Sequence, residues 1–374
     1  MKSSIVSLVS CASYDPLVVQ ESVRQALSLQ GGMTTFIKKG ARVLVKPNAL
    51  MAQDPATGIV THPEVVRAVI RLLKEHGCSV LLGDSPSVFG KEISNVSFVY
   101  EKTGLTRVAK EEGVALVMFD KRLWRGKFPL THWLGECDAL VSIPKFKTHG
   151  LTIMTAGVKN LFGLVCGTYK TELHKNFFES HDFSQMLVEL YETVRPALTI
   201  VDGVEAIEGN GPATSGQLCK PAVIAAASDC VALDSVLACV MGIDPLRVPT
   251  TRIAASRAIG VADMARIEVR GKQVKDVFIR PFILSSSSGL AYKLPRLLAP
   301  VVKMLIRYYP YVIHGRCVRC GACVRACPQK VVSMGTKQVA FDYRGCIACF
   351  CCQEVCPQAA IDTKKSFCAR LLGL

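Results

Sequence analysis

Short apolar segments alternate with helical periodicity over the first 290 residues of the chain. The apolar segments lie at 5–9, 42–46, 79–82, 115–119, 139–143, 198–201 and 223–226, and apolar residues recur with helical spacing at 16–29, 63–75, 183–193 and 231–241. Strands buried on both faces are apolar throughout, whereas strands with one wet face alternate. The pattern therefore predicts an α/β fold, with a mostly parallel sheet and helices on both faces.

Polar residues follow several of these predicted strands. They are Lys46 and Asn48 after the second strand, Asp84 after the third, Lys145, Lys147 and His149 after the fifth, and Lys159 and His174 between the fifth and the sixth. Ligands of such sheets bind beyond the carboxyl ends of the strands. We therefore expect the lysines, the asparagine and the aspartate to bind a small anionic substrate, a carboxylate or a phosphate. Either histidine could then transfer protons.

Helix capping and exposure to water are the competing interpretation for each of these residues, and Asp84 in particular could be a simple cap. The segment Lys145–His149 is harder to explain in this way, because three basic side chains directly follow a buried strand. We expect these residues to lie in loops around the substrate.

The carboxyl-terminal part of the chain contains two cysteine runs of one spacing. Ten of the seventeen cysteines fall within 317–374, and eight of them spell C-x2-C-x2-C-x3-C-P twice. The first run holds Cys317, Cys320, Cys323 and Cys327, and the second holds Cys346, Cys349, Cys352 and Cys356. This is the ligand run of bacterial two-cluster ferredoxins, so we expect two [4Fe–4S] clusters in a ferredoxin-like domain.

The fourth cysteine of each run is expected to ligate the other cluster. One cluster would then be held by Cys317, Cys320, Cys323 and Cys356, and the other by Cys346, Cys349, Cys352 and Cys327. Zinc also binds paired C-x2-C motifs, but this spacing fits a four-ligand zinc site poorly. Cys351 is out of register and is expected to be a packed thiol. Phe350 stands where the first run has Gly321, and we expect it to shield its cluster.

The formal charge of +15 is concentrated at the same end of the chain, where residues 293–374 hold thirteen Lys or Arg and three Asp or Glu. A basic excess can indicate nucleic acid, but no aromatic residues are interleaved with the basic ones, and we do not expect nucleic acid as a partner. The basic side chains beside the cysteines offset the negative charge of the clusters. They could also dock a redox partner protein that donates or accepts electrons.

No apolar run reaches the roughly 20 residues of a transmembrane helix. The apolar residues 5–9 form too short a segment for an export signal, and we interpret them as the first strand. Many cysteines without an export signal are typical of metal or redox chemistry in a reducing compartment. We therefore expect a cytoplasmic protein without a transmembrane segment.

The composition divides the chain into four segments. We expect the α/β domain at 1–284, a linker and amphipathic helix at 285–312, the ferredoxin-type domain at 313–364 and a tail at 365–374. The serines at 285–288 are typical of a hinge. An apolar stripe over 294–308 with basic residues on the other faces predicts the helix, which we expect to pack between the domains; binding to a membrane surface is the alternative.

With these motifs assembled, the chain resembles the family called domain of unknown function 362, fused to a two-cluster ferredoxin-type domain. The segments that carry the resemblance are VLVKPN, THPEVV, GDSP, PKFKTHG, VKNLFG, DGVEAIEGNGP and SDCVALDSVLACVMG. They spread over most of residues 1–270. The resemblance implies a cytosolic iron–sulfur protein and implies no particular reaction.

Three functions fit these features. The first is an iron–sulfur oxidoreductase that relays electrons between the clusters and a small anionic substrate in the α/β domain. The second is an electron-transfer subunit whose α/β domain docks a partner protein, and the third is a redox-sensing binding protein. The lysines and histidines after the strands favour the first. The chain has no fingerprint of a dinucleotide or P-loop site, which favours the second, because two-electron chemistry usually needs a further cofactor.

Overall fold

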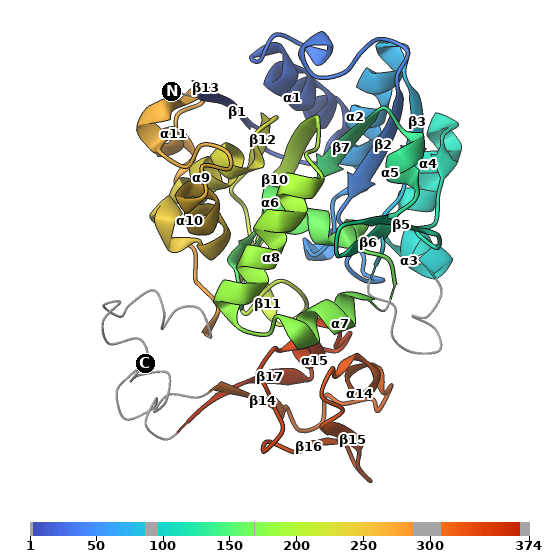
Figure 1. The fold of residues 1–374 in the computed structure, drawn as a ribbon, viewed down its shortest axis with the longest axis vertical. Helices are drawn as coiled ribbons and strands as arrows, with labels where there is room; N and C mark the ends of the chain where they lie inside the picture. Colours follow the sequence, from blue (N-terminus) through green and yellow to red (C-terminus); the bar gives the residue numbers. More distant parts are fainter. Residues whose placement is uncertain (1–2, 87–95, 168, 287–307, 367–374) are drawn as a thin grey trace.

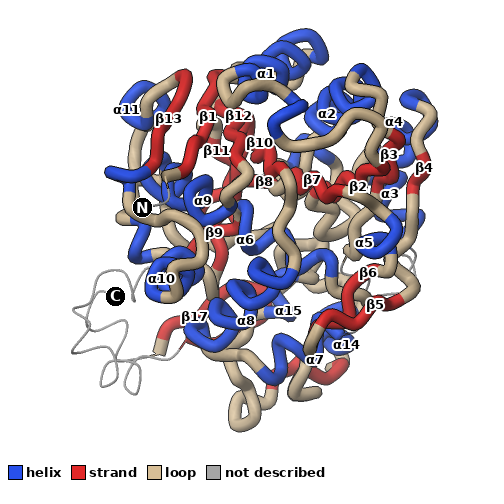
Figure 2. The backbone as a smooth tube through the Cα atoms, turned by 45° about the horizontal axis from the view of Figure 1, so that its top comes forward, coloured by secondary structure: helices blue, strands red, loops and turns tan. Residues whose placement is uncertain are grey.

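A large twisted sheet forms the centre of the molecule. The structure, a computed structural model, describes residues 3–86, 96–167, 169–286 and 308–366. In this part of the chain the large sheet has eleven strands, with the order β13-β1-β12-β10-β7-β2-β3-β4 and with β8, β9 and β11 attached to the side (Figures 1 and 2). Its main strands are β1 (Ser4–Ser10), β2 (Arg42–Pro47), β3 (Ser79–Leu82), β7 (Ala139–Ile143), β10 (Leu198–Gly209), β12 (Val223–Ala227) and β13 (Ile267–Gly271).

The sheet is mixed and mostly parallel, as predicted. Strands β10, β7, β2, β3 and β4 (Ala115–Leu116) run parallel to one another, and β12 is antiparallel to both β10 and β1. The carboxyl ends of β2, β3 and β7 therefore meet at one edge of the sheet. This is the edge at which open α/β sheets bind ligands.

Helices cover both faces of the sheet, which explains why the strands are apolar throughout. Val43 and Val45 of β2 pack into the core that contains α1 (Pro16–Ser28) and α2 (Pro63–Glu75). Leu44 points to the opposite face, into the core of α8 (Ser180–Thr193) and α10 (Pro249–Ser256). Successive side chains of a strand alternate between the faces, so each face needs its own apolar partner layer.

Asp229 caps the amino-terminal end of α9 (Cys230–Val240). Oδ1 of Asp229 accepts hydrogen bonds from the backbone N–H groups of Val231 (2.8 Å) and Ala232 (3.2 Å). Such a cap satisfies backbone donors that have no partner within the helix. Cys230 directly after it is fully buried.

Two segments differ from the sequence-based expectation. Residues 145–149 are not a loop but the strand β8 (Lys145–His149), which pairs with β10 and with β9 (Ile153–Thr155). The reason is that β10 continues to Gly209, well beyond the expected end at 201, and so offers β8 an edge for pairing. The predicted strand at 115–119 is limited to the two residues of β4 at the edge of the sheet.

The carboxyl-terminal domain is built from short elements. Strand β14 (Tyr308–Val312) pairs with β17 (Ile361–Lys365), and β15 (Val332–Met334) pairs with β16 (Val339–Phe341). Two short helices, α14 (Ala322–Ala326) and α15 (Cys351–Glu354), carry cysteines. Residues 308–312 thus form a strand of this domain and do not belong to the linker. The aromatic residues of YYPYV favour a strand, and an edge strand tolerates the proline.

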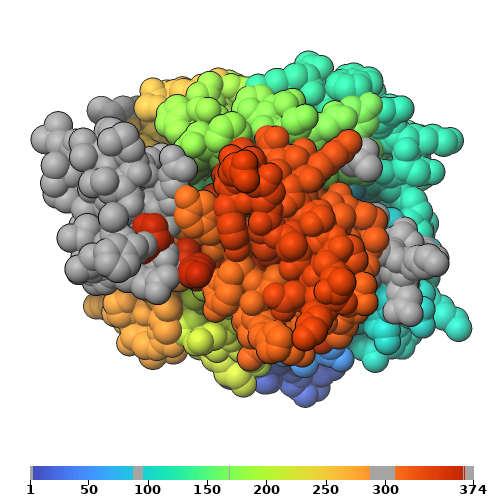
Figure 3. Space-filling model, turned by 90° about the horizontal axis from the view of Figure 1, so that it is seen from below, coloured from blue at the N-terminus to red at the C-terminus, as the bar shows by residue number. Residues whose placement is uncertain are grey.

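The expected amphipathic helix lies, except for Tyr308, outside the described residues, and so do the residues after 366. Seen from below, the carboxyl-terminal domain covers the middle of one face of the molecule (Figure 3). None of the helices in the described ranges is long and apolar enough to span a membrane.

Candidate functional site

A cavity of about 90 Å³ lies between the edge of the sheet and the carboxyl-terminal domain. Seven of the eight predicted binding and proton-transfer residues line it, namely Lys46, Asn48, Asp84, Lys147, His149, Lys159 and His174. The eighth, Lys145, is not among the lining residues. The carboxyl-terminal domain contributes Ala326 of α14, Cys351 and Glu354 of α15, and Val355. The cavity is therefore formed by both domains.

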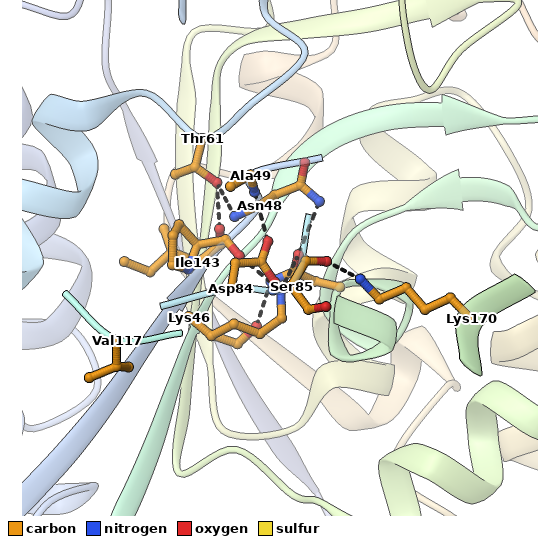
Figure 4. Close-up of polar contacts among 12 residues, drawn as sticks. Lys46, Asn48, Ala49, Thr61, Asp84, Ser85, Val117, Ile143 and Lys170 are labelled. Atoms are coloured by element: carbon orange, nitrogen blue, oxygen red, sulfur yellow. Dashed lines mark hydrogen bonds and ion pairs between the residues drawn. The ribbon is translucent and has the colours of Figure 1, made fainter. Parts of the chain in front are cut away.

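A buried ion pair lies at the floor of the cavity (Figure 4). Nζ of Lys46 lies 2.8 Å from Oδ1 of Asp84, and both side chains are almost completely buried. The other carboxylate oxygen of Asp84 accepts from the N–H of Ala49 (2.8 Å), and Nζ of Lys46 also donates to the carbonyl of Pro47 (2.9 Å). A Cβ on Gly163 would lie 2.5 Å from Nζ of Lys46, so only glycine fits against this pair.

Lys147 is buried and donates hydrogen bonds to two acceptors of the protein. Its Nζ donates to Oδ1 of Asn48 (2.9 Å) and to the carbonyl of Ile59 (2.7 Å). The amide nitrogen of Asn48 in turn donates to Oδ1 of Asn160 (3.2 Å). Burial lowers the pKa of Lys147 well below its ordinary value, and the neighbouring Lys159 lowers it further. This lysine fixes the position of Asn48 at the wall of the cavity.

Lys159 is the cation of the cavity that has no polar partner. Within the described residues its ammonium group makes no hydrogen bond or ion pair, and it lies over the rings of Phe162 (5.0 Å) and Phe183 (5.5 Å). Its helix α6 (Gly157–Asn160) is held by Asp234, whose carboxylate accepts from the N–H groups of Gly157 (2.6 Å) and Val158 (3.1 Å). Burial lowers the pKa of Lys159.

A fourth lysine of the lining, Lys170 of α7 (Tyr169–Asn176), reaches the cavity from the other side. Its Nζ donates to the carbonyl of Ser85, beside the ion pair (Figure 4). Burial lowers its pKa to about 8, although Asp84 acts in the opposite direction. Lysines therefore reach the cavity from β2, β8, α6 and α7.

The contacts of His149 determine which nitrogen carries the proton. Nδ1 accepts from the backbone N–H groups of Leu151 (3.1 Å) and Thr152 (3.3 Å), so the proton of the neutral ring is on Nε2. Nε2 lies 3.4 Å from Oε1 of Glu354 and has no hydrogen-bond partner. Burial lowers the pKa of His149 well below 6.5, and Lys159 adds to this effect. The ring is thus neutral and directs an N–H into the cavity.

Two further buried polar atoms of the lining have no hydrogen-bond partner in the part of the chain that the structure describes. These are Nδ1 of His174 and Oγ1 of Thr155. The ring of His174 stacks on Phe183, with 4.5 Å between the ring centres, and burial lowers its pKa to about 3. Buried polar atoms without partners are rare and costly, so their convergence on one cavity indicates a polar ligand.

Lys145 lies in a different environment. Its Nζ is 2.9 Å from Oδ2 of Asp202 and also donates to the hydroxyl of Tyr14 (2.5 Å). Asp202 accepts further bonds from the Tyr14 hydroxyl (2.9 Å) and from the N–H of His62 (2.8 Å). Lys145 and Asp202 are completely buried. The members of this network are bonded to one another inside the core. The network therefore holds β8 and β10 together and presents no free polar group to a ligand.

The eight cysteines of the two runs surround two separate cavities. One is lined by Cys317, Cys320, Cys323 and Cys356, and the other by Cys327, Cys346, Cys349 and Cys352. Within the described ranges no three Cys, His, Asp or Glu side chains are grouped to hold one metal ion. Thiols that surround a cavity, four at a time, fit the larger body of an iron–sulfur cluster better than a single zinc ion.

The two cysteine loops have the same backbone conformation. Arg319 and Gly321 in the first loop have positive φ angles of 55° and 74°, and Ala348 and Phe350 in the second have 52° and 58°. Phe350 therefore adopts the conformation that glycine adopts without strain. Its side chain is buried and lines the second cysteine cavity. Cys351 lines the cavity between the domains and neither cysteine cavity.

Hydrogen bonds join the loop after β10 to the carboxyl-terminal domain. Oγ1 of Thr214 donates to the carbonyl of Cys356 (2.7 Å), and Oγ of Ser215 donates to the carbonyl of Ile361 (3.2 Å). Nδ2 of Asn210 donates to Oδ1 of Asp362 (3.1 Å). These contacts hold the cysteine domain over the edge of the sheet.

The lining residues that were not predicted from the sequence include Thr155 and Glu354. Thr155 ends β9 and carries no motif. Glu354 stands two residues before Cys356, where the first run has Arg325 two residues before Cys327. Arg325 is exposed, whereas Glu354 faces the cavity. The difference between the two repeats is therefore the signal that would have identified Glu354.

An α/β sheet joined to a two-run cysteine domain defines the chain as an iron–sulfur electron-transfer protein. The model of the family called domain of unknown function (DUF362) matches residues 43–239, and the chain belongs to this family. The model of the 4Fe-4S dicluster domain matches residues 309–357. Both agree with the resemblance stated above.

One curated relative and one solved structure complete the comparison. The thylakoid-associated protein sll1697 of Synechocystis sp. is 35% identical over 263 residues, which are 68% of this chain and 79% of that protein. The lactate racemase apoprotein from Thermoanaerobacterium thermosaccharolyticum is similar with a TM-score of 0.36 and 15% identity. That similarity covers 61% of this chain and 55% of the racemase chain.

Proposed function

We propose that the protein is an oxidoreductase that relays electrons between two [4Fe–4S] clusters and a small anionic substrate in the cavity between the domains. The observation that carries this proposal is the composition of the cavity wall. Lys159 on one side has no polar partner among the described residues, and α15 on the other side carries both a cavity residue, Cys351, and a cluster ligand, Cys352. A substrate there would lie beside the second cluster.

The ligand sets we propose are those expected from the spacing. The first cluster takes Cys317, Cys320, Cys323 and Cys356, and the second takes Cys346, Cys349, Cys352 and Cys327. When bound, the clusters supply one-electron transfer. The first site is accessible from solvent, since Cys320 is exposed and the side chain of Val318 is 61% exposed. This supports exchange of electrons with a redox partner protein at the first site and with the substrate at the second.

The lining residues would have different roles. Lys159 would bind the negative charge of the substrate directly, and Lys46, Asp84, Lys147 and Asn48 would hold the shape of the floor through their mutual contacts. His149 would donate a hydrogen bond from Nε2, because its Nδ1 is occupied. His174 is the better proton carrier, because its Nδ1 has no partner and an adjacent anion raises the pKa of a histidine. Lys145 would contribute only to the stability of the fold.

Iron content tests the ligand sets. Cys352→Ser should lose about half of the iron, because three ligands hold a cubane poorly. Its neighbour Cys351→Ser is the matched control and should keep all of the iron, since Cys351 faces the other cavity. Loss of iron from the Cys351 variant would contradict the assignment.

Anaerobic reoxidation tests the reaction. The protein is reduced with its clusters filled and mixed with small anionic metabolites, while visible absorbance and products are followed. The proposal expects one anion to reoxidise the clusters and to be converted, and Lys159→Gln to abolish this. The absence of any reoxidation by anions, with rapid reoxidation by an acidic electron-carrier protein, would instead favour an electron-transfer subunit. The exposed first cysteine loop is the observation that favours this second candidate.

The proposed location is the cytoplasm. None of the cysteines of the described ranges forms a disulfide, which supports a reducing compartment. Cell fractionation with detection of the full chain tests this, and recovery with the membranes would contradict it.

A further inference from the structure

We propose that the cavity between the domains selects a small oxyanion, with about four non-hydrogen atoms inside the cavity, which Lys159, Thr155 and His149 bind as hydrogen-bond donors. This inference deepens the proposed function, because it concerns the substrate class of the same site. It rests on the contacts of the lining residues and on the size of the cavity.

Three of the free polar groups of the lining, on Lys159, His149 and Thr155, are donors. Nζ of Lys159 can only donate. Nε2 of His149 also donates, because the two backbone N–H groups on Nδ1 place the proton on Nε2. The hydroxyl of Thr155 can donate as well, and no described residue accepts from it. A ligand that presents only acceptors, as a carboxylate, phosphate or sulfate does, would satisfy all three.

The other lysines of the lining already have acceptors within the protein. Lys46 is paired with Asp84, and Lys147 donates to Asn48 and to the carbonyl of Ile59. Lys170 donates to the carbonyl of Ser85. These lysines add positive potential to the cavity, whereas Glu354 is the carboxylate that opposes them from the second domain. The free donors and the potential both favour an anion.

The size of the cavity limits the ligand. A protein cavity of about 150 Å³ holds benzene, which has six carbon atoms. The cavity between the domains has about 90 Å³ and is partly open to one side. On this scale the cavity holds about four non-hydrogen atoms, so it takes a carboxylate group or most of a phosphate or sulfate ion, and the rest of a larger ligand lies outside.

Isothermal titration calorimetry of the oxidised full-length protein, with both clusters filled, tests the inference. The probes are inorganic phosphate, sulfate and oxalate, with dimethyl sulfone as a neutral probe of the size of sulfate. We expect one site per chain for at least one of the three small anions. Preference for the tetrahedral anions would indicate a phosphate- or sulfate-like substrate, and preference for oxalate a carboxylate.

Variants locate the site. Lys159→Gln should weaken binding of the best anion about 10- to 100-fold, as expected for loss of a charged hydrogen bond. Thr155→Val, which keeps the shape of the side chain, should weaken it about 5- to 10-fold. Lys39→Gln removes an exposed lysine and is the matched control for net charge, so its affinity should remain unchanged.

Three results would overturn the inference: no binding of any small anion, equally tight binding of dimethyl sulfone, or unchanged affinity in Lys159→Gln. Because no electrons flow in the oxidised protein, this experiment is independent of the reaction. An anion that binds as expected but never reoxidises the reduced clusters would contradict the proposed oxidoreductase and leave the anion site in place.

Discussion

Lys145 and Lys159 are both lysines of the α/β domain that were predicted to bind the substrate, and their surroundings differ completely. Lys145 is completely buried, and its ammonium group contacts Asp202 and Tyr14. Lys159 lies in the cavity wall, where its ammonium group makes no hydrogen bond or ion pair with a described residue and lies over two aromatic rings. A lysine after a buried strand is thus not in itself a sign of a ligand site. What distinguishes the two is whether the charge already has a partner.

The largest expected effect concerns the stability of the network around Lys145. Lys145→Met leaves the buried carboxylate of Asp202 without its counter-charge and should destabilise the protein by about 3–5 kcal/mol. Lys159→Met removes a charge without a polar partner and should leave the free energy of unfolding unchanged or raise it. Anaerobic urea unfolding measures both. Equal losses in the two variants would remove the distinction between the two lysines.

A smaller effect is the contribution of His174 to the pH dependence of the free energy of unfolding. The unfolded chain binds a proton at the ordinary pKa of 6.5, whereas burial lowers the pKa in the folded chain to about 3. The folded state therefore binds fewer protons in this range, and stability falls as the pH drops from 6.5 toward 3. At pH 5 the loss from His174 is about 2 kcal/mol.

His174→Phe, which retains the stacking on Phe183, should lack this loss. The measurement is urea unfolding of both proteins at pH 7 and pH 5. The burial of His62, whose pKa is lowered to about 4, acts in the same direction but is common to both proteins. An identical pH dependence would show that His174 already has a proton partner in the folded protein.

The smallest expected effect compares two threonines of the β8–β9 hairpin. Oγ1 of Thr148 donates to the carbonyl of Gly209 (2.9 Å), whereas Oγ1 of Thr155 has no hydrogen-bond partner among the described residues. Thr148→Val should cost about 1 kcal/mol, and Thr155→Val should be neutral or slightly stabilising. Thermal unfolding without added anion measures the difference. A larger loss in the Thr155 variant would mean that its hydroxyl supports the fold instead of a ligand.

The cysteine runs and the main strands could be predicted from the sequence because each depends on local spacing. The ferredoxin run fixes the positions of its cysteines within a few residues. Strands such as β2 are apolar because both of their faces are covered, which is also visible locally. Lys46 and Asp84 were placed at the same edge of the sheet because each follows a strand of a mostly parallel sheet.

Other features depend on contacts between distant segments, and the sequence did not reveal them. Whether Lys145 is paired depends on Asp202, 57 residues away. β8 is a strand because β10 extends beyond its apolar core to residue 209. Glu354 reaches the cavity between the domains only because the loop after β10 holds the cysteine domain against the sheet.

Electron paramagnetic resonance of the reduced protein tests the central claim most directly, namely that a ligand in the cavity lies beside one of the two clusters. Spectra are recorded with and without a saturating amount of the best-binding small anion, for the natural protein and for Lys159→Gln. The account predicts that the anion changes the signal of one cluster only, the one that is missing in Cys352→Ser, and that Lys159→Gln shows no change. Unchanged spectra at saturation in the natural protein would contradict it.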